Sequence, residues 1–191
     1  MAKKAKSTLL NMFLSLTIIA VVAAGLLALV SSVTKEPIEK SEKAKTEKAI
    51  KDVLPDFDRL EDKDVNGMKC HLAYKDEKPV TVAVESASEK GFGGNIGIMF
   101  GFDLATGNIT GYSILKSNET PGLGAKADKW FQEGSKGCVV GKNPGTDNLK
   151  VKKDGGDVDA ISGSTITSRA FCDALDQAYK TFLALGGQQS E

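Results

Sequence analysis

The stretch from Asp159 to Ser168 combines residue types that can hold an anion. It is rich in small and hydroxyl side chains and leads into an amphipathic segment that predicts a helix ending near Leu185. Amide groups and the dipole at the start of a helix favour a negatively charged group such as phosphate. A helix cap needs only one hydroxyl, whereas this turn has the hydroxyls of Ser162, Ser164, Thr165 and Thr167 beside Gly163. The sequence therefore predicts a phosphate-binding turn in which one hydroxyl could be bonded covalently.

A second segment, Glu119-Thr120-Pro121-Gly122-Leu123-Gly124, has a composition that suits contact with a flat ring. Its proline and two glycines favour a tight backbone with little side-chain cover. Leu123 offers an apolar face and Thr120 a hydroxyl. The alternative interpretation of this segment is an ordinary connector.

The composition argues against several other kinds of chemistry. There is one histidine, His71, and the three cysteines Cys70, Cys138 and Cys172 are far apart, so we expect no metal or iron–sulfur site. The net charge of zero gives no reason to expect a nucleic-acid partner. We expect no catalytic acid–base pair. Whether Cys70 and Cys138 form a disulfide stays open, because the sequence does not give their distance.

The N-terminal segment predicts a membrane anchor. Leu9 to Val30 contains no charged residue, and a helix of that length spans about 33 Å, enough for a hydrocarbon core of about 30 Å. Lysines 3, 4 and 6 precede it and place the N-terminus in the cytoplasm. A cleaved signal peptide is the alternative, but this run is too long and no Ala-x-Ala site ends it.

The elements that must position the two motifs follow the anchor. Residues Lys35 to Leu54 predict a charged helix with Pro37 in its first turn and Pro55 at its end. Apolar alternation predicts strands over 69–74, 79–86, 96–104 and 108–116. A short helix is expected over 125–133. The final helix is expected to bury Phe171, Ala174, Leu175, Ala178 and Phe182. A strand meander with single helices favours an α+β fold with a mainly antiparallel sheet and flanking helices.

The string Asp159-Ala160-Ile161-Ser162-Gly163-Ser164-Thr165 closely resembles the Asp-x-x-Ser/Thr-Gly-Ala-Thr flavinylation motif of FMN-binding domains. The segment Glu119–Gly124 resembles a second signature of the same domain. Together with the anchor, the two motifs resemble the G subunit of the Rnf ion-translocating electron transport complex. Ser164 departs from the motif's alanine and adds a hydroxyl beside Thr165.

This resemblance implies roles for individual residues. Thr165 would carry FMN as a phosphoester attached by a flavin transferase, which makes the chain a flavoprotein and a phosphoprotein, and Asp159 would be part of what the transferase recognises. The phosphate would be lined by Ser162, Gly163, Ser164 and Thr167. Thr120 and Leu123 would contact the isoalloxazine ring, with Glu119 and Gly122 in the same signature. Phe92, in a glycine cluster, would lie near the flavin.

The implied organisation is a cytoplasmic N-terminus and transmembrane anchor over 1–34, a charged linker helix and connector over 35–64, and an FMN-binding domain over 65–191. The resemblance implies a single-pass bacterial inner-membrane protein whose FMN domain lies on the periplasmic or extracellular side. It would be an electron-transfer subunit of a ferredoxin:NAD-type translocase, with other membrane and peripheral subunits as partners, rather than a complete enzyme.

Three alternatives remain open at this point. One is the related C subunit of the sodium-pumping NADH:quinone reductase. Another is a stand-alone membrane-anchored extracellular flavoprotein. The third is a non-redox anchor protein that binds a phosphate ligand reversibly.

Overall fold

The computed structural model describes residues 8–186. The chain divides into two compact units, residues 1–44 and 45–191, and helix α1 (Leu9–Val53) begins in the first and ends in the second.

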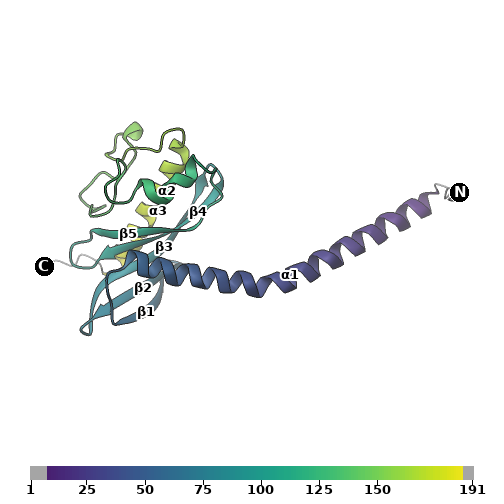
Figure 1. Ribbon diagram of the computed structural model, residues 1–191, viewed down its shortest axis with the longest axis horizontal. Helices are drawn as coiled ribbons and strands as arrows, with labels where there is room; N and C mark the ends of the chain where they lie inside the picture. The colour runs from purple at the N-terminus through teal and green to yellow at the C-terminus, as the bar shows by residue number, and fades with distance from the viewer. Residues whose placement is uncertain (1–7, 187–191) are drawn as a thin grey trace. The chain divides into compact units, whose positions relative to one another are not determined.

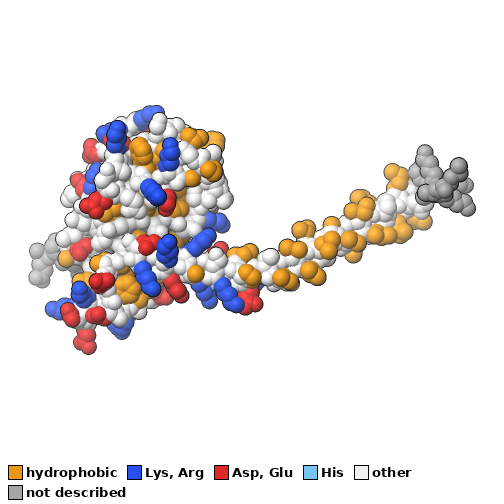
Figure 2. All heavy atoms as spheres, in the orientation of Figure 1, with side chains coloured by type: hydrophobic (Ala, Val, Ile, Leu, Met, Phe, Trp, Pro, Cys, Tyr) orange, Lys and Arg blue, Asp and Glu red, His pale blue; other side chains and the backbone are white. Residues whose placement is uncertain are grey.

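The N-terminal part of α1 has the properties expected of a membrane span. Its most apolar 18-residue window has a mean hydropathy of 2.7, and none of that window is buried. Figure 2 shows hydrophobic side chains along this stretch and charged side chains only beyond it. By length and composition the helix can cross a membrane.

The expectation of a separate helix beginning near Lys35 was wrong, because α1 is continuous and contains Pro37. Proline has no N–H and removes one backbone hydrogen bond from a helix interior. The residues that follow Pro37 are mostly Lys, Glu and Ala, which favour helix, and Lys40 forms an ion pair with Glu36 across the proline at 2.7 Å. The helix therefore continues through the proline and ends before Pro55, as expected.

The second unit contains a five-stranded sheet of β1 (Arg59–Val65), β2 (Met68–Lys75), β3 (Lys78–Gly91), β4 (Gly94–Asp103) and β5 (Ile109–Lys116). The strands pair antiparallel in the order β1-β2-β3-β4-β5 (Figure 1), which confirms the predicted meander. Strand β1 was not expected, because its charged sequence has no apolar alternation. It lies at the edge of the sheet, where charged residues are common.

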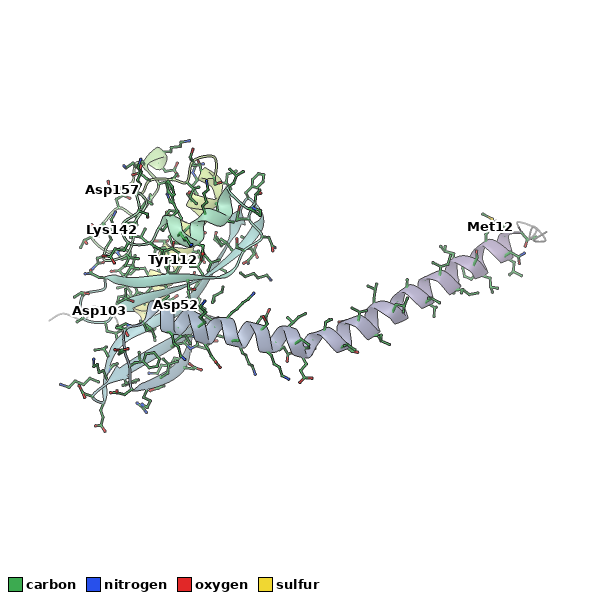
Figure 3. All side chains as sticks on the ribbon, viewed as in Figure 1. Met12, Asp52, Asp103, Tyr112, Lys142 and Asp157 are labelled. Carbon is green, nitrogen blue, oxygen red and sulfur yellow. The ribbon has the colours of Figure 1, made fainter. Side chains whose placement is uncertain are left out.

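Helix α3 (Thr165–Ala184) packs on one face of this sheet. Phe100 and Phe102 of β4 are fully buried on this face, as expected. The predicted apolar stripe of α3 is also buried, from Phe171 to Phe182. A 3-10 turn (Gly124–Lys126) leads into the short helix α2 (Ala127–Trp130). Tyr112 of β5, which is labelled in Figure 3, donates a hydrogen bond to the carbonyl of Ala127 at 2.6 Å. A further 3-10 turn, η2 (Lys152–Asp154), precedes the predicted phosphate turn.

The last turns of α1 pack on the opposite face of the sheet, where small residues form a row across three strands. Ala83 pairs with Gly101, and Gly101 pairs with Gly111. The carbonyl of Val53 accepts a hydrogen bond from Thr110 Oγ1 at 2.6 Å. A Cβ atom on Gly101 would lie 2.4 Å from the Val53 oxygen. The absence of side chains at Gly101 and Gly111 therefore lets the end of α1 approach the sheet backbone.

We expect Gly101→Ala to destabilise the sheet unit by about 1–3 kcal/mol, because the added methyl group must displace the end of α1. Gly97→Ala is the matched control on the same strand, since its added Cβ would meet only Lys116, with the Cβ of that residue 3.5 Å away. Denaturant unfolding of the full chain in detergent measures both variants. Equal unfolding midpoints would show that the close contact at Gly101 has no energetic importance.

His71, also on the α1-facing side of the sheet, lies between two carboxylates. Its Nδ1 is 2.6 Å from Asp62 Oδ1 and its Nε2 is 3.1 Å from Glu85 Oε1. Both ring nitrogens can donate to carboxylates only when the imidazole is doubly protonated. The hydrogen bond to Glu85 raises the pKa of His71, burial opposes the shift, and Asp62 adds to it.

This arrangement predicts a stability that depends on pH. Because the pKa of His71 is raised in the folded state, its contribution is complete below the unfolded pKa of about 6.5 and is lost as the pH rises through the folded pKa. Denaturant unfolding of the wild type and of His71→Gln from pH 6 to pH 9 tests this. The stability difference between them should shrink toward high pH, and a constant difference would contradict a charged imidazole.

Candidate functional site

The predicted phosphate turn lies at the start of α3, and its backbone is tied to the first turn of that helix. Gly163 has a φ of +77°, a conformation that favours glycine. Ser168 Oγ accepts a hydrogen bond from the Ile161 amide and donates one to the Ser164 carbonyl, each at 2.9 Å. Thr165 is the first helical residue, and the preceding Ser164 makes no side-chain capping bond. Helix capping therefore does not account for the run of hydroxyls.

The hydroxyls of this turn differ in their access to solvent. Ser162 is exposed and Thr165 is partly exposed, whereas Ser164 and Thr167 are 8% and 1% exposed. The Thr167 hydroxyl points inward and donates to Glu119 Oε2 at 2.8 Å. In the first turn of α3, the Thr165 hydroxyl is therefore more accessible than that of Thr167. Ser164, which precedes the helix, is buried.

A lysine of the preceding 3-10 turn lies next to Thr165. Lys153, in η2, donates a hydrogen bond from Nζ to Thr165 Oγ1 at 3.4 Å. The neighbouring Asp154 forms two hydrogen bonds with Arg169, at 2.7 and 2.6 Å, which hold the pKa of that carboxyl below its usual range. The ion pair between Asp154 and Arg169 links η2 to α3. The neighbouring Lys153 is therefore held at the start of the helix, where its ammonium group is an available cation.

The second predicted motif lies against the first. The carbonyl of Thr120 accepts hydrogen bonds from the amides of Leu123 and Ala125, at 3.1 and 3.2 Å, and closes a tight turn. Gly122 has a φ of +78° within it. A Cβ atom on Gly163 would lie 3.4 Å from Leu123 Cδ2, in ordinary contact. The tertiary structure thus brings together two loops that are distant in the sequence.

Several apolar side chains on these segments are exposed. Phe92, in the turn between β3 and β4, is 72% exposed, and Leu123 is 45% exposed. Ile166, which directly follows Thr165, is 48% exposed and was missed by the sequence analysis. Its position outside the buried stripe of α3 was the available signal. Exposed apolar side chains flanking a hydroxyl, a cation and a helix start suit a ligand with a phosphate and a flat ring.

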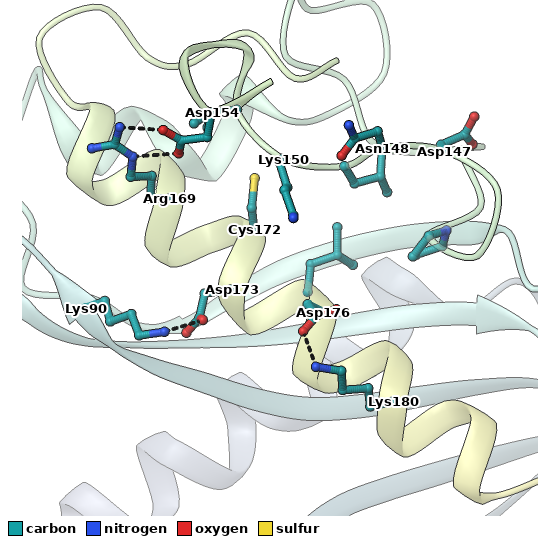
Figure 4. A pocket seen from close by; sticks show the side chains of 14 residues that line it. Lys90, Asp147, Asn148, Lys150, Asp154, Arg169, Cys172, Asp173, Asp176 and Lys180 are labelled. Carbon is teal, nitrogen blue, oxygen red and sulfur yellow. Dashed lines mark hydrogen bonds and ion pairs between the residues drawn. The ribbon is translucent and has the colours of Figure 1, made fainter. Parts of the chain in front are cut away.

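A cavity of about 550 Å³ lies elsewhere, between α3 and the segment 144–154. Figure 4 shows that its rim contains the ion pairs Arg169–Asp154, Lys90–Asp173 and Lys180–Asp176. None of the predicted site residues lines it. Its cysteine, Cys172, is buried, and burial raises the pKa of the thiol to about 12, so this thiol is unreactive at neutral pH.

The structure also describes the state of the cysteines and the grouping of side chains that could bind a metal ion. Cys70, Cys138 and Cys172 are all free thiols. Among residues 8–186 there is no group of three or more His, Cys, Asp or Glu side chains that could hold a metal ion.

We expect Ser168→Ala to destabilise the chain by about 1–3 kcal/mol, because the Ile161 amide would be left buried without its acceptor. Ser162→Ala removes an exposed hydroxyl of the same turn and is the matched control, with an expected change of less than about 0.5 kcal/mol. Thermal unfolding of the two variants compares them. A neutral Ser168→Ala would show that the turn does not depend on this hydroxyl.

Comparison with known proteins places these features in a family. Residues 91–180 match the family model of the FMN-binding domain, and residues 6–53 match that of the RnfG N-terminal region. The chain is 33% identical over 193 residues to the G subunit of the ion-translocating oxidoreductase complex of Erwinia tasmaniensis, covering 92% of this chain and 90% of the relative. The corresponding protein of Salmonella typhi is 32% identical, with 86% of each chain covered.

A solved structure, that of the C subunit of the Na⁺-translocating NADH-quinone reductase from Parabacteroides distasonis, matches with a TM-score of 0.42 and 26% identity. The match covers 65% of this chain and 64% of that one. The two family models and the near full-length relatives agree on the same assignment: this chain belongs to the family of G subunits of ion-translocating oxidoreductase complexes.

Proposed function

We propose that this chain is an electron-carrying subunit of a membrane-bound ion-translocating oxidoreductase and that it relays electrons through FMN esterified to Thr165 Oγ1. The match to the FMN-binding domain and the naming of the relatives support the coarser statement. The proposal of a covalent attachment is argued from the position of Thr165.

The observation that carries the attachment is the position of the Thr165 hydroxyl. It is at the first residue of α3, is partly exposed, and accepts a hydrogen bond from Lys153. The helix start and the lysine both favour the negative charge of a phosphoester. Ser164, the neighbour that could compete, is 8% exposed, which supports Thr165 as the modified residue.

The surrounding side chains fit the rest of FMN. Leu123, Phe92 and Ile166 offer exposed apolar surface on three segments around the helix start. Burying such surface against a flat ring is favourable. In this proposal Leu123, Thr120 and Phe92 orient the ring, while Ser162, Gly163 and Ser164 shape the turn that holds the phosphate.

FMN, when bound, supplies the redox chemistry of such a protein. The chain's own residues have other tasks: Thr165 provides the attachment, Lys153 balances the phosphate charge, and the apolar side chains exclude water from the ring. None of these roles needs a general acid or base, which is consistent with a carrier of electrons rather than a complete enzyme.

The membrane arrangement is part of the proposal. Lysines before Leu9 favour a cytoplasmic N-terminus, which would place the FMN domain on the periplasmic or extracellular side; these lysines lie outside the described residues. A covalent bond is useful on that side, where a dissociated FMN could not readily be replaced. The apolar stretch of α1 carries no charge that could serve an ion path, so ion transport would require the other subunits of the complex.

Maturation and assembly imply two kinds of partner. A flavin transferase would attach FMN, with Asp159 as part of the recognised sequence. Its side chain forms an ion pair with Lys152 at 2.8 Å and is 39% exposed. The other membrane and peripheral subunits of an Rnf-type complex would exchange electrons with the bound flavin.

Intact-mass analysis of the chain made together with its flavin transferase tests the attachment. We expect an added mass of FMN less water in the wild type, no added mass in Thr165→Ala, and the full addition in Ser164→Ala, because Ser164 is buried. Retention of the flavin by Thr165→Ala would assign the attachment to another residue. An unmodified wild type from the native host would refute the covalent relay and leave reversible binding.

A further inference from the structure

The carboxylate of Glu119 lies where three segments meet that are far apart in the sequence. Its Oε1 accepts a hydrogen bond from the Gly93 amide at 3.1 Å, and its Oε2 accepts one from Thr167 Oγ1 at 2.8 Å. Glu119 itself begins the loop that carries Leu123. One buried carboxylate, 8% exposed, thus joins the turn of Phe92, the loop of Leu123 and the first turn of α3.

Glycines on these segments leave the room that the carboxylate occupies. A Cβ atom on Gly124 would lie 2.3 Å from Glu119 Oε2, and one on Gly91 would lie 2.8 Å from Oε1. A Cβ atom on Gly93 would lie 2.2 Å from the carbonyl of Asn118, the residue before Glu119. All three close approaches are to the protein itself, so the packing around Glu119 accounts for these glycines without a ligand.

The hydrogen bonds of Glu119 must offset the cost of burying it. Among the described residues, no Lys, Arg or His lies within ion-pair distance of its carboxylate. Its two hydrogen bonds are charge-assisted and therefore stronger than those between neutral groups. Losing the carboxylate would leave the Gly93 amide and the Thr167 hydroxyl without their acceptor.

We infer that Glu119 is a positioning residue: it holds the Phe92 turn and the Leu123 loop against the start of α3 and is not itself a contact of the flavin. Both of its oxygens face protein donors, whereas Phe92, Leu123 and Ile166 are the exposed large apolar side chains of the three segments. This inference rests on the proposed function only in taking FMN as the ligand of the site.

Hydrogen–deuterium exchange on the full chain in detergent, made without the flavin transferase, tests the positioning role directly. In Glu119→Ala, exchange across residues 91–94 should be at least about tenfold faster, because the Gly93 amide loses its acceptor. Glu119→Gln should stay within about threefold of the wild type, since its amide oxygen can accept from Gly93 and its amide nitrogen can donate to Thr167.

A matched control separates a local role from a general loss of stability. Ser86 is also buried, and its hydroxyl donates to the Ala174 carbonyl at 2.8 Å between β3 and α3. Ser86→Ala should lower the unfolding temperature without accelerating exchange at 91–94. If Glu119→Ala does not fold, Thr167→Val removes one of the two hydrogen bonds and Thr167→Ser retains it, so only the valine variant should loosen the Leu123 loop.

Co-expression with the transferase adds a readout of the flavin itself. We expect Glu119→Ala to lose the visible circular dichroism of a held flavin ring and Glu119→Gln to keep it. Normal exchange at 91–94 in Glu119→Ala, or a glutamine variant as impaired as the alanine variant, would overturn the inference. A wild-type chain without FMN on Thr165 would refute the proposed function instead, and it would leave the exchange result intact.

Discussion

The packing of α3 against the sheet determines where everything else in the second unit can lie. Phe171 is the centre of that contact: its ring centroid lies 5.3 Å from that of Phe100, 4.8 Å from Tyr112 and 4.0 Å from Phe131. Because successive residues of an α-helix are about 100° apart around its axis, burying Phe171 also fixes the direction of the residues one turn earlier. Thr167 then points inward to Glu119, while Thr165 and Ile166 remain accessible.

Strand β4 contacts α3 on one face of the sheet and the last turns of α1 on the other. Phe100 and Phe102 pack toward α3, while Gly101 between them receives the carbonyl of Val53. Alternation along a strand makes this division possible, since adjacent residues point to opposite faces. Strand β4 therefore has large side chains on the face that packs against α3 and a glycine on the face where α1 ends. Neighbouring residues of one strand meet these two packing needs.

The buried ionisable groups of this unit have structural tasks. His71 joins Asp62 and Glu85 on the α1-facing side of the sheet, and the inferred role of Glu119 is to join the segments of the site. The groups accessible at the start of α3 include the Thr165 hydroxyl, Lys153 and apolar surface. That combination suits a protein that holds and orients a cofactor, in agreement with membership of a family whose relatives are subunits of an ion-translocating oxidoreductase.

The sequence alone predicted the features that depend on local pattern. The apolar alternation of Ile96 to Phe102 predicted a core strand, the spacing from Phe171 to Phe182 predicted the buried stripe of α3, and the two motifs indicated the FMN-binding domain. Strand β1 was missed, because an edge strand needs little apolar surface of its own and is held by its partner β2. The continuity of α1 through Pro37 was also missed, since one lost hydrogen bond is outweighed by good helix-forming neighbours.

Other features were decided only by the tertiary structure, because they join residues that no local pattern relates. The approach of Lys153 to Thr165 and the burial of Ser164 depend on how η2 and the turn fold onto α3. The inward direction of Glu119 depends on a hydrogen-bond donor 26 residues before it and another 48 residues after it. Short-range propensities determine which element a residue joins, whereas long-range packing determines which of its atoms face the protein and which remain accessible.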